Sequence, residues 1–294
     1  MLSNAKIFIT YHKPATLLKH MPSVVAIHGG RALRTATKDG AVKGKDLEWL
    51  RQNTIGDDSG DNISFKNREF CELTALYWVY KNYDLTNYSH VGFMQYRRHF
   101  IFNESSFKST KNNFEEESFS IKRYPKINNQ YIDTIGLTEE RLKEYIKKYD
   151  CIIPYAGNLS RAKVDSIWLD YAQQIPGLHI DDLILLREIF AQIHPSEIKE
   201  FDFYLSQPNK LMYLMFILKK DIFFDYCRYL FNILFEVEKK LDVSLYTPNG
   251  RRTMGFLGEI LYGYYFRKMK LMLDDKVKEL GISLVEDTRV ENGI

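Results

Sequence analysis

Cysteine is scarce in this sequence, and the few cysteines present are not clustered. Cys71, Cys151 and Cys227 lie far apart among 294 residues, and no Cys-x-x-Cys pair occurs. Such spacing lacks the ligand pattern of a structural zinc site and the paired cysteines of a disulfide framework. We therefore expect reduced thiols and a cytoplasmic location.

Motifs of several common enzyme classes are also missing. The chain has no GxGxxG and no GxxxxGK[ST] segment, so the usual glycine-rich phosphate cradles are absent. It has no HExxH and no GxSxG, which disfavours zinc proteases of that type and serine hydrolases. The N-terminal residues do not resemble a signal peptide. The longest apolar run, residues 211–218, is far shorter than the roughly 20 residues that a membrane-spanning helix requires.

Charge and composition exclude further classes. The net charge of +3 is too small to indicate a nucleic-acid-binding protein. Hydrophobic residues make up 45% and charged residues 27% of the chain, which is ordinary for a globular protein. Aromatic residues reach 14%, and we expect most of these rings in the core.

Apolar periodicity predicts alternating strands and helices. A strand over 6–11, a helix from Ser64 to about Asn82 and a strand over 91–96 form a strand–helix–strand unit of an α/β sheet. Residues 104–130 are polar and predict a long loop or lid. We therefore predict a doubly wound mixed α/β sheet whose ligands bind beyond the carboxyl ends of the strands. The other predicted strands are 24–27, 150–154 and 211–218, and the other predicted helices are 138–149, 165–174, 180–193, 221–241 and 254–272.

The most informative segment is residues 90–100, HVGFMQYRRHF, in which an apolar strand leads into Arg97 and Arg98. The planar arginine fork matches phosphate geometry, so this pair is a candidate diphosphate site. The alternative is that the pair binds carboxylates at a sheet edge, and Glu72 is a plausible partner. Adjacent strand residues point to opposite faces. Both arginines can therefore reach one phosphate only if the strand ends before them.

Polar residues follow other predicted strands and turns. His12 and His28 each follow a strand, where a structural role is the alternative to a catalytic one. Asp57, Asp58 and Asp61 could hold a divalent cation, or they could simply build a capped turn. Glu259 and Glu72 are carboxylates in apolar segments, and each is either a candidate general base or half of a structural ion pair.

The chain resembles a family of bacterial glycosyltransferases that build capsular and exopolysaccharides and share an (H/Q)YRRxF motif. The resemblance spans nearly the whole chain in the right order. Its motifs are YHK at 11–13, IHGG at 27–30, GDDSGDNIS at 56–64, KNREFCELTALYW at 66–78, GFMQYRRHF at 92–100, and weaker blocks at 215–217, 226–231 and 252–259.

This resemblance implies a GT-A-like α/β fold in a single domain over 1–294. Residues 1–155 would form the nucleotide-sugar half, and residues 156–294 the more helical acceptor half. The implied activity is an inverting hexosyl transfer from a UDP-sugar, with galactofuranose or galactopyranose favoured. The implied acceptor is a lipid-linked or oligosaccharide glycan of the bacterial surface, such as capsule or lipopolysaccharide, at the inner face of the cytoplasmic membrane.

The resemblance also assigns roles to individual residues. Arg97 and Arg98 would stabilise the diphosphate leaving group, which could make a metal dispensable; Mn²⁺ or Mg²⁺ at the aspartate turn is the alternative. Glu259 or Asp165 would act as the base that deprotonates the acceptor hydroxyl. The donor would be bound by Tyr11, His12, Lys13, His28, Gly29, Asp58, Asn62, Ser64, Asn67 and Tyr96.

Three positions depart from the family pattern. The family usually has His where this chain has Gln95, Asn where it has Leu214, and Arg where it has Ile260. The last two changes delete polar groups, so a catalytically impaired nucleotide-sugar or glycan-binding module is an alternative function. A third hypothesis is a scaffold of a polysaccharide assembly complex that uses the aromatic and basic segment 261–272 as a contact or membrane surface.

Overall fold

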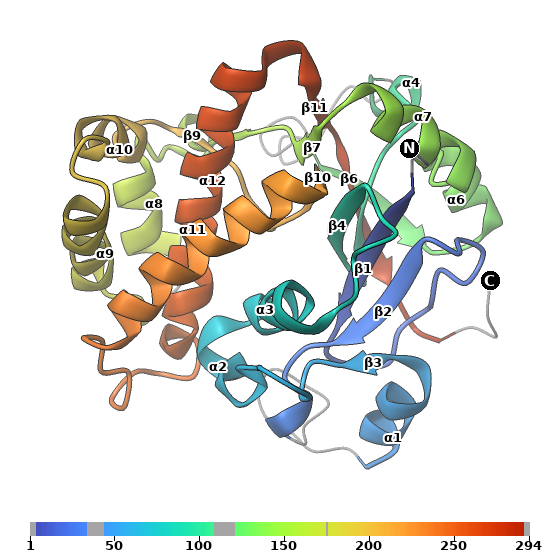
Figure 1. Ribbon diagram of the computed structural model, residues 1–294, viewed down its shortest axis with the longest axis horizontal. Helices are drawn as coiled ribbons and strands as arrows, with labels where there is room; N and C mark the ends of the chain where they lie inside the picture. Colours follow the sequence, from blue (N-terminus) through green and yellow to red (C-terminus); the bar gives the residue numbers. More distant parts are fainter. Residues whose placement is uncertain (1–3, 34–43, 109–120, 175, 291–294) are drawn as a thin grey trace.

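A computed structural model describes residues 4–33, 44–108, 121–174 and 176–290. Its centre is a mixed sheet with the strand order β11-β7-β10-β4-β1-β2-β3 (Figure 1), and β5, β12 and β6 extend it from β4. The strands are β1 (Ala5–Tyr11), β2 (Val24–His28), β3 (Ile55–Gly56), β4 (His90–Gln95), β5 (Arg98–Phe100), β6 (Ile121–Lys126), β7 (Cys151–Pro154), β10 (Phe216–Lys219), β11 (Val277–Leu280) and β12 (Ile282–Asp287), and β8 (Gly157–Asn158) pairs with β9 (Asn209–Lys210) in a separate ribbon.

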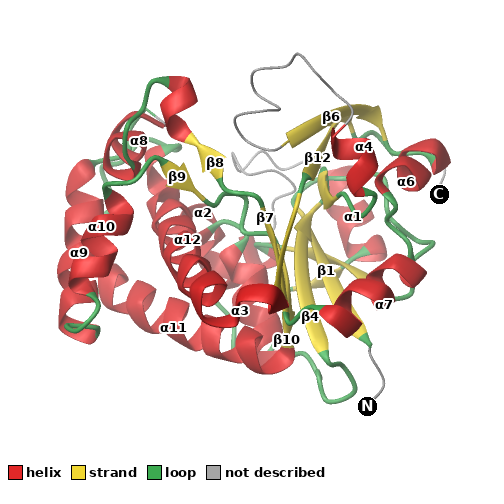
Figure 2. Cartoon of the chain, turned by 90° about the horizontal axis from the view of Figure 1, so that it is seen from above, coloured by secondary structure: helices red, strands yellow, loops and turns green. Residues whose placement is uncertain are grey.

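Helices cover both faces of the sheet, and a group of them extends to one side (Figure 2). They are α1 (Gly44–Asn53), α2 (Asn67–Phe70), α3 (Leu73–Asn82), α4 (Glu104–Lys108), α6 (Asn129–Ile135), α7 (Glu139–Lys148), α8 (Ile167–Gln174), α9 (Ile180–Ile193), α10 (Ile198–Leu205), α11 (Lys220–Glu238) and α12 (Thr253–Leu273). The helices predicted over 138–149, 180–193, 221–241 and 254–272 are thus confirmed as α7, α9, α11 and α12. Thr138 caps the N-terminus of α7, since its Oγ1 accepts a hydrogen bond from Arg141 N at 3.3 Å.

Side chains of the central strands alternate between two hydrophobic clusters. In β1, Phe8 joins the cluster under α3, α11 and α12, whereas Ile7 and Ile9 join the cluster on the opposite face. β10 behaves likewise, with Phe216 on the first face and Ile217 on the second. This period of two buries both faces of the sheet.

Most strands of the sheet run in the same direction, so their carboxyl ends meet at one edge. β1 is parallel to β2 and β4, and β7 is parallel to β11, whereas β10 is antiparallel to both of its neighbours. The mixed α/β sheet that the sequence predicts is therefore present. The last two strands, β11 and β12, follow the helical part and return the chain to the sheet, which the sequence reading missed.

Two predicted elements are interrupted where the backbone takes an unusual conformation. The single helix expected over 64–82 is instead a 3-10 turn (Ser64–Lys66), α2 and α3, because Cys71 between the two helices has φ 51°. The strand expected over 211–218 is reduced to β10, because Tyr213 and Leu214 have φ values of 76° and 50°. Both interruptions lie at the site described below.

The predicted loop over 104–130 is partly structured. It contains α4 and β6, and its residues 109–120 lie outside the described residues. The three cysteines are buried free thiols, as expected. Within the described ranges, no helix is long and apolar enough to cross a bilayer.

Candidate functional site

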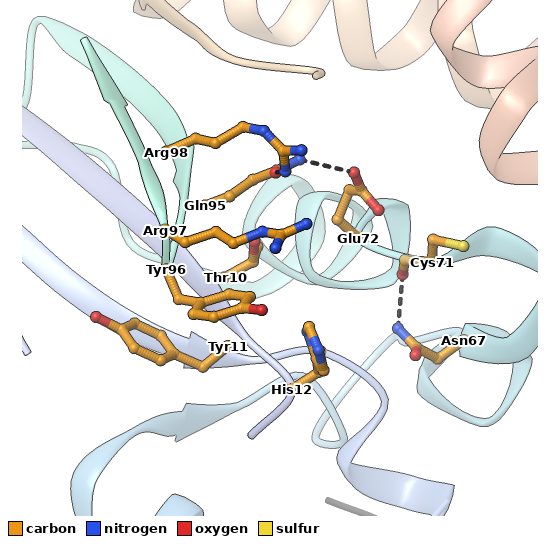
Figure 3. Close-up of a pocket in the computed structure, with 11 residues that line it drawn as sticks. Thr10, Tyr11, His12, Asn67, Cys71, Glu72, Gln95, Tyr96, Arg97 and Arg98 are labelled. Carbon is orange, nitrogen blue, oxygen red and sulfur yellow. Dashed lines mark hydrogen bonds between the residues drawn. The ribbon is translucent and has the colours of Figure 1, made fainter. Parts of the chain in front are cut away.

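A pocket opens at the carboxyl edge of the sheet, where β1, β2 and β4 end beside α2 and α3. Figure 3 shows its lining. One wall comes from the ends of β1 and β4, and the other comes from the break between α2 and α3. Its lining residues are Thr10, Tyr11, His12, Gly29, Asn67, Cys71, Glu72, Gln95, Tyr96, Arg97 and Arg98. The pocket therefore unites three segments that the sequence placed at strand ends.

Tyr96 is the centre of an aromatic group on one wall. The ring of His12 meets it edge-on at 5.0 Å, and the ring of Tyr11 lies 6.1 Å away. Lys13 does not line the pocket, but its Nζ lies 5.5 Å from the centre of the Tyr96 ring. Such a group offers faces on which a nucleobase or sugar can stack.

Arg97 and Arg98 have different environments because the strand ends before them. β4 stops at Gln95, residues 96–97 form the turn, and β5 starts at Arg98, which pairs with Gln95 across the hairpin. Arg98 is held within the protein: its Nη1 donates to Gln95 Oε1 at 2.6 Å, and its guanidinium lies 4.7 Å from the Tyr213 ring centre. Burial lowers the pKa of Arg98, and the neighbouring charge of Arg97 lowers it further.

Arg97 points into the pocket toward the side where Glu72 and Cys71 lie (Figure 3). Within the described part of the chain, its guanidinium makes no ion pair with any carboxylate. A partly buried cation without a carboxylate partner is available to an anionic ligand.

Gln95 connects Arg98 to Glu72. Its Nε2 donates to Glu72 Oε1 at 3.0 Å and to the Tyr213 carbonyl at 2.9 Å, while its Oε1 accepts from Arg98. The amide thus has its acceptor and both donors engaged, and its orientation is fixed by these partners. Glu72 therefore pairs with Gln95, and the expected ion pair of Glu72 with Arg97 or Arg98 is replaced by this bridge.

Asp57 joins three segments below the pocket. Its two carboxylate oxygens accept hydrogen bonds from Gly30 N at 2.7 Å, Arg31 N at 3.0 Å, Ser64 Oγ at 2.5 Å and Thr74 Oγ1 at 2.7 Å. Burial raises the pKa of Asp57, and these four bonds act in the opposite direction. Asp57 is fully buried, so it fixes the loop after β2 against α3.

The loop after β2 also depends on a glycine. Gly30 has φ 78°, and a Cβ at this position would lie 2.5 Å from the side chain of Asn67. Asn67 in turn donates from Nδ2 to the Cys71 carbonyl at 2.6 Å and to Thr74 Oγ1 at 2.9 Å. These contacts hold the turn around Cys71 open toward the pocket.

The remaining predicted site residues are distributed as follows. His28 is buried below the pocket, Ser64 bonds to Asp57, and Asp58, Asp61 and Asn62 lie away from the pocket lining. The three aspartates do not converge as a metal site would require, because Asp57 is buried and Asp58 and Asp61 are exposed. Among the described residues, no group of three histidines, cysteines or acidic residues is arranged to hold a metal ion.

Of the two predicted bases, one lies near the pocket and one does not. Glu259 is partly exposed on α12. Burial raises the pKa of the Glu259 carboxyl, the positive charge of Lys210 lowers it, and the negative charge of Glu72 raises it. Glu259 therefore lies among the charged groups behind the pocket. Asp165 is exposed in the loop before α8 and does not line the pocket.

The sequence did not indicate Cys71 or Thr10 as site residues, and it indicated Glu72 only as a candidate base or ion-pair partner. Glu72 is the only carboxylate among the described residues that line this pocket. In the sequence, Glu72 stands out as a charged residue among the apolar positions of a predicted helix. Cys71 gave no such signal, because its role comes from a positive φ, which is uncommon for a non-glycine residue and often marks a functional site.

Neither Leu214 nor Ile260 lines this pocket, but Leu214 lines a small adjoining cavity that shares Thr10, Glu72 and Gln95 with it. Ile260 is fully buried in the apolar cluster under the sheet. Leu214 has φ 50°, a conformation that asparagine adopts more readily than leucine.

Comparisons with known proteins agree with this arrangement. The family described as "Domain of unknown function (DUF4422)" matches residues 6–270. The chain is also similar to the apo structure of WbbM, which is described as a bifunctional glycosyltransferase, with 30% sequence identity and a TM-score of 0.83. That similarity covers 99% of this chain and 47% of the WbbM chain, so this chain spans about half of its length. A comparison with curated proteins found no match. The architecture is thus a GT-A-like α/β fold.

Proposed function

The chain belongs to the family of the domain of unknown function DUF4422, and on this premise we propose that it is a glycosyltransferase with a nucleotide-sugar donor. The observation that carries the proposal is Arg97, a cation without a carboxylate partner among the described residues, in a pocket at the carboxyl edge of the sheet. The likeness to a bifunctional glycosyltransferase over nearly the whole chain supports the same reaction class.

The donor is a UDP-hexose, with galactofuranose or galactopyranose as the first sugars to test. The aromatic group of Tyr11, His12 and Tyr96 contacts the nucleoside, and Arg97 binds the diphosphate. Arg98 sits behind Arg97 and adds positive charge from a fixed position. Preorganised charge at the leaving group lowers the barrier, because no reorganisation is required as the charge develops.

The transfer inverts the anomeric centre. The acceptor hydroxyl oxygen forms a bond to the anomeric carbon while the bond from that carbon to the diphosphate oxygen breaks. The acceptor proton passes to a carboxylate, and UDP leaves with its charge stabilised by Arg97. Glu72 is the base that the pocket geometry favours, since it is the carboxylate among the described lining residues. Glu259 lies farther from the pocket, behind Glu72. Asp165 is exposed away from the pocket lining, so its position does not favour it as the base.

The second candidate is a binding module that has lost catalysis, which the changes at Leu214 and Ile260 motivated. Ile260 is fully buried in the core, so the change at this position removes no group from the pocket. Leu214 lines a small cavity that shares Thr10, Glu72 and Gln95 with the donor pocket, so the change at this position lies next to the donor. Turnover of a bound UDP-hexose separates the two functions, since a binding module would bind the donor without releasing UDP.

A thermal-shift titration with UDP tests the proposal. At 100 times its dissociation constant, UDP should add about 2.7 kcal/mol to the free energy of unfolding, which corresponds to a rise in Tm of about 5 °C in a chain of this size. The Arg97→Ala variant should lose most of this shift. Arg228→Ala is the matched control, because Arg228 is exposed and pairs with Asp225 on α11.

Repeating the titration with Mn²⁺ and with a chelator tests metal dependence. A shift that survives chelation supports direct binding of the diphosphate by Arg97. A shift that requires metal would show that a cation takes part in binding the diphosphate. The absence of any shift, or an equal shift in wild type and Arg97→Ala, would refute this placement of the donor.

A further inference from the structure

A second, larger cavity lies on the helical side of the sheet. Its volume is about 640 Å³, and it is formed by α10, the C-terminal half of α12, β9 and the end of β7. This volume falls in the range of small-molecule sites. None of the catalytic or donor-binding residues assigned above lines this cavity.

The chemistry of the lining suits a carbohydrate. Phe203 presents an aromatic face that is 53% exposed, with the Arg267 guanidinium 5.2 Å from the ring centre. Gln207 and Asn209 provide amide groups beside this ring. An exposed aromatic face next to amides and an arginine matches a sugar, whose C–H face stacks on rings and whose hydroxyls form hydrogen bonds.

A buried tyrosine also forms part of the lining. Tyr204 lines the cavity and is 2% exposed, and its hydroxyl has no hydrogen-bond partner within the described residues. The hydroxyl occupies the space beside Gly263, where a Cβ would lie 2.1 Å away. Because this oxygen is buried beside α12, Tyr204 shapes the wall of the cavity, and contact of its hydroxyl with a ligand would require a shift of the ring.

Helix α12 extends from behind the donor pocket to the cavity. Glu259 lies behind the donor pocket, whereas Gly263, Phe266, Arg267 and Lys270 line the cavity. Positions 259, 263, 266, 267 and 270 lie on one side of the helix, because 259, 263, 266 and 270 are spaced by three or four residues and 267 is adjacent to 266. Eleven residues separate Glu259 from Lys270, which corresponds to about 16 Å along the helix axis.

Segment 209–214 also extends from the cavity to the donor pocket. Asn209 and Leu211 line the cavity, and Tyr213 contacts Arg98 and accepts the Gln95 hydrogen bond at the donor pocket. The two pockets thus border the same short segment, and the subsite proposed below requires an extended ligand that lies along it from the cavity to Glu72.

A membrane contact is the alternative use of this face, because Leu271 and Met272 are 74% and 68% exposed. However, the nearby lysines are already neutralised: Lys268 pairs with Glu197 at 2.5 Å, and Lys270 pairs with Glu279 at 2.6 Å. The rings of Tyr262, Tyr264 and Phe266 are in the core. Of the basic residues in segment 261–272, Arg267 alone has no acidic partner among the described residues, and a single cation is a weak attraction for an anionic bilayer.

We propose that this cavity is a subsite for an oligosaccharide acceptor, which binds the sugar units behind the one that is glycosylated. The proposal rests on the transferase function proposed above. It predicts that affinity increases with acceptor length, because only an acceptor of several units reaches from Glu72 to Phe203.

Binding of methyl glycosides to the full chain in the presence of UDP tests this proposal. The probes are galactosyl and glucosyl series of one, two and four units, and the readout is the dissociation constant from isothermal titration calorimetry. At least one tetrasaccharide should bind tenfold or more tightly than its monosaccharide. Phe203→Ala and Asn209→Ala should abolish this gain and leave monosaccharide binding unchanged. The control is Phe65→Ala, a phenylalanine that is 60% exposed outside the cavity.

The outcomes separate the two proposals. If neither series gains affinity with length, or if Phe203→Ala retains the gain, the acceptor subsite is refuted. Binding to phosphatidylglycerol vesicles that Met272→Ala abolishes would assign this face to a membrane and would also refute the subsite. Loss of the UDP shift with retained length dependence would instead refute the transferase function, while the glycan site would remain.

Discussion

Replacement of Asp57 by asparagine tests whether this residue organises the site from within the core. Asp57 is fully buried and accepts hydrogen bonds from two backbone amides and two hydroxyls. In Asp57→Asn, one oxygen becomes an NH₂ group in either orientation of the amide. That group then faces the N–H of Gly30 or Arg31, which cannot turn away, so a buried donor loses its acceptor.

The expected loss of stability follows from these contacts. An unsatisfied buried amide costs about 1–3 kcal/mol, and the remaining bonds weaken by about 1 kcal/mol each because the charge is removed. The substitution also relieves the cost of burying a charge, which is the cost that raises the pKa of Asp57. We therefore expect a net loss of about 3 kcal/mol.

Urea unfolding at pH 7 measures this change. The midpoint should fall at constant slope, and UDP binding should weaken because the loop of Gly29 and Gly30 is no longer held. Asp58→Asn is the control, since Asp58 is exposed and its variant should change stability by less than about 0.5 kcal/mol. A loss below about 1 kcal/mol in Asp57→Asn would show that the four hydrogen bonds do not hold the loop, and the role given to Asp57 would be wrong.

Three further variants probe the pocket and the core. Arg98→Ala should lower the free energy of unfolding, measured in urea, by about 3 kcal/mol, because it removes a charge-assisted hydrogen bond and a cation–π contact. Arg97→Ala should change the same free energy by less than about 0.5 kcal/mol. Equal losses would contradict the different environments of the two arginines. Glu72→Gln should lower kcat by about a hundredfold or more with donor binding unchanged, and a larger loss in Glu259→Gln would assign the base to Glu259 instead. Burial lowers the pKa of His99 to about 3, whereas the pKa in the unfolded chain is about 6.5. As the pH falls, the unfolded chain therefore takes up the proton before the folded chain does. The free energy of unfolding should consequently decrease below about pH 6.5. This contribution is roughly 2 kcal/mol by pH 5, and His99→Gln should flatten the pH profile of urea unfolding between pH 7 and 5; an unchanged slope would refute the assignment.

Much of the fold follows from local patterns in the sequence. The strand over 6–11 and the helices α7, α9, α11 and α12 were predicted because their apolar residues repeat with the period of each element. The strand ends at Tyr11, His12 and Tyr96 could be placed at one edge because parallel strands share their carboxyl ends. The pocket opens at this edge.

Contacts between distant segments were not predictable in the same way. Asp57 appeared as part of an acidic turn, and only the fold shows that four donors from three segments surround it. Likewise, the break at Cys71 and the one at Tyr213 and Leu214 follow from positive φ angles that no residue-type preference predicts at these positions.

The amino-acid sequence alone thus determined the α/β class, most long elements and the edge of the sheet at which the pocket opens, because these depend on short-range periodicity and strand direction. Only the tertiary structure decided which arginine faces the pocket, which carboxylate lines it, and that α10 and α12 enclose a second cavity. These features depend on the packing of residues that are up to 187 positions apart in the chain, as between Glu72 and Glu259. Their relative positions are set by the whole fold and are not encoded in any local pattern.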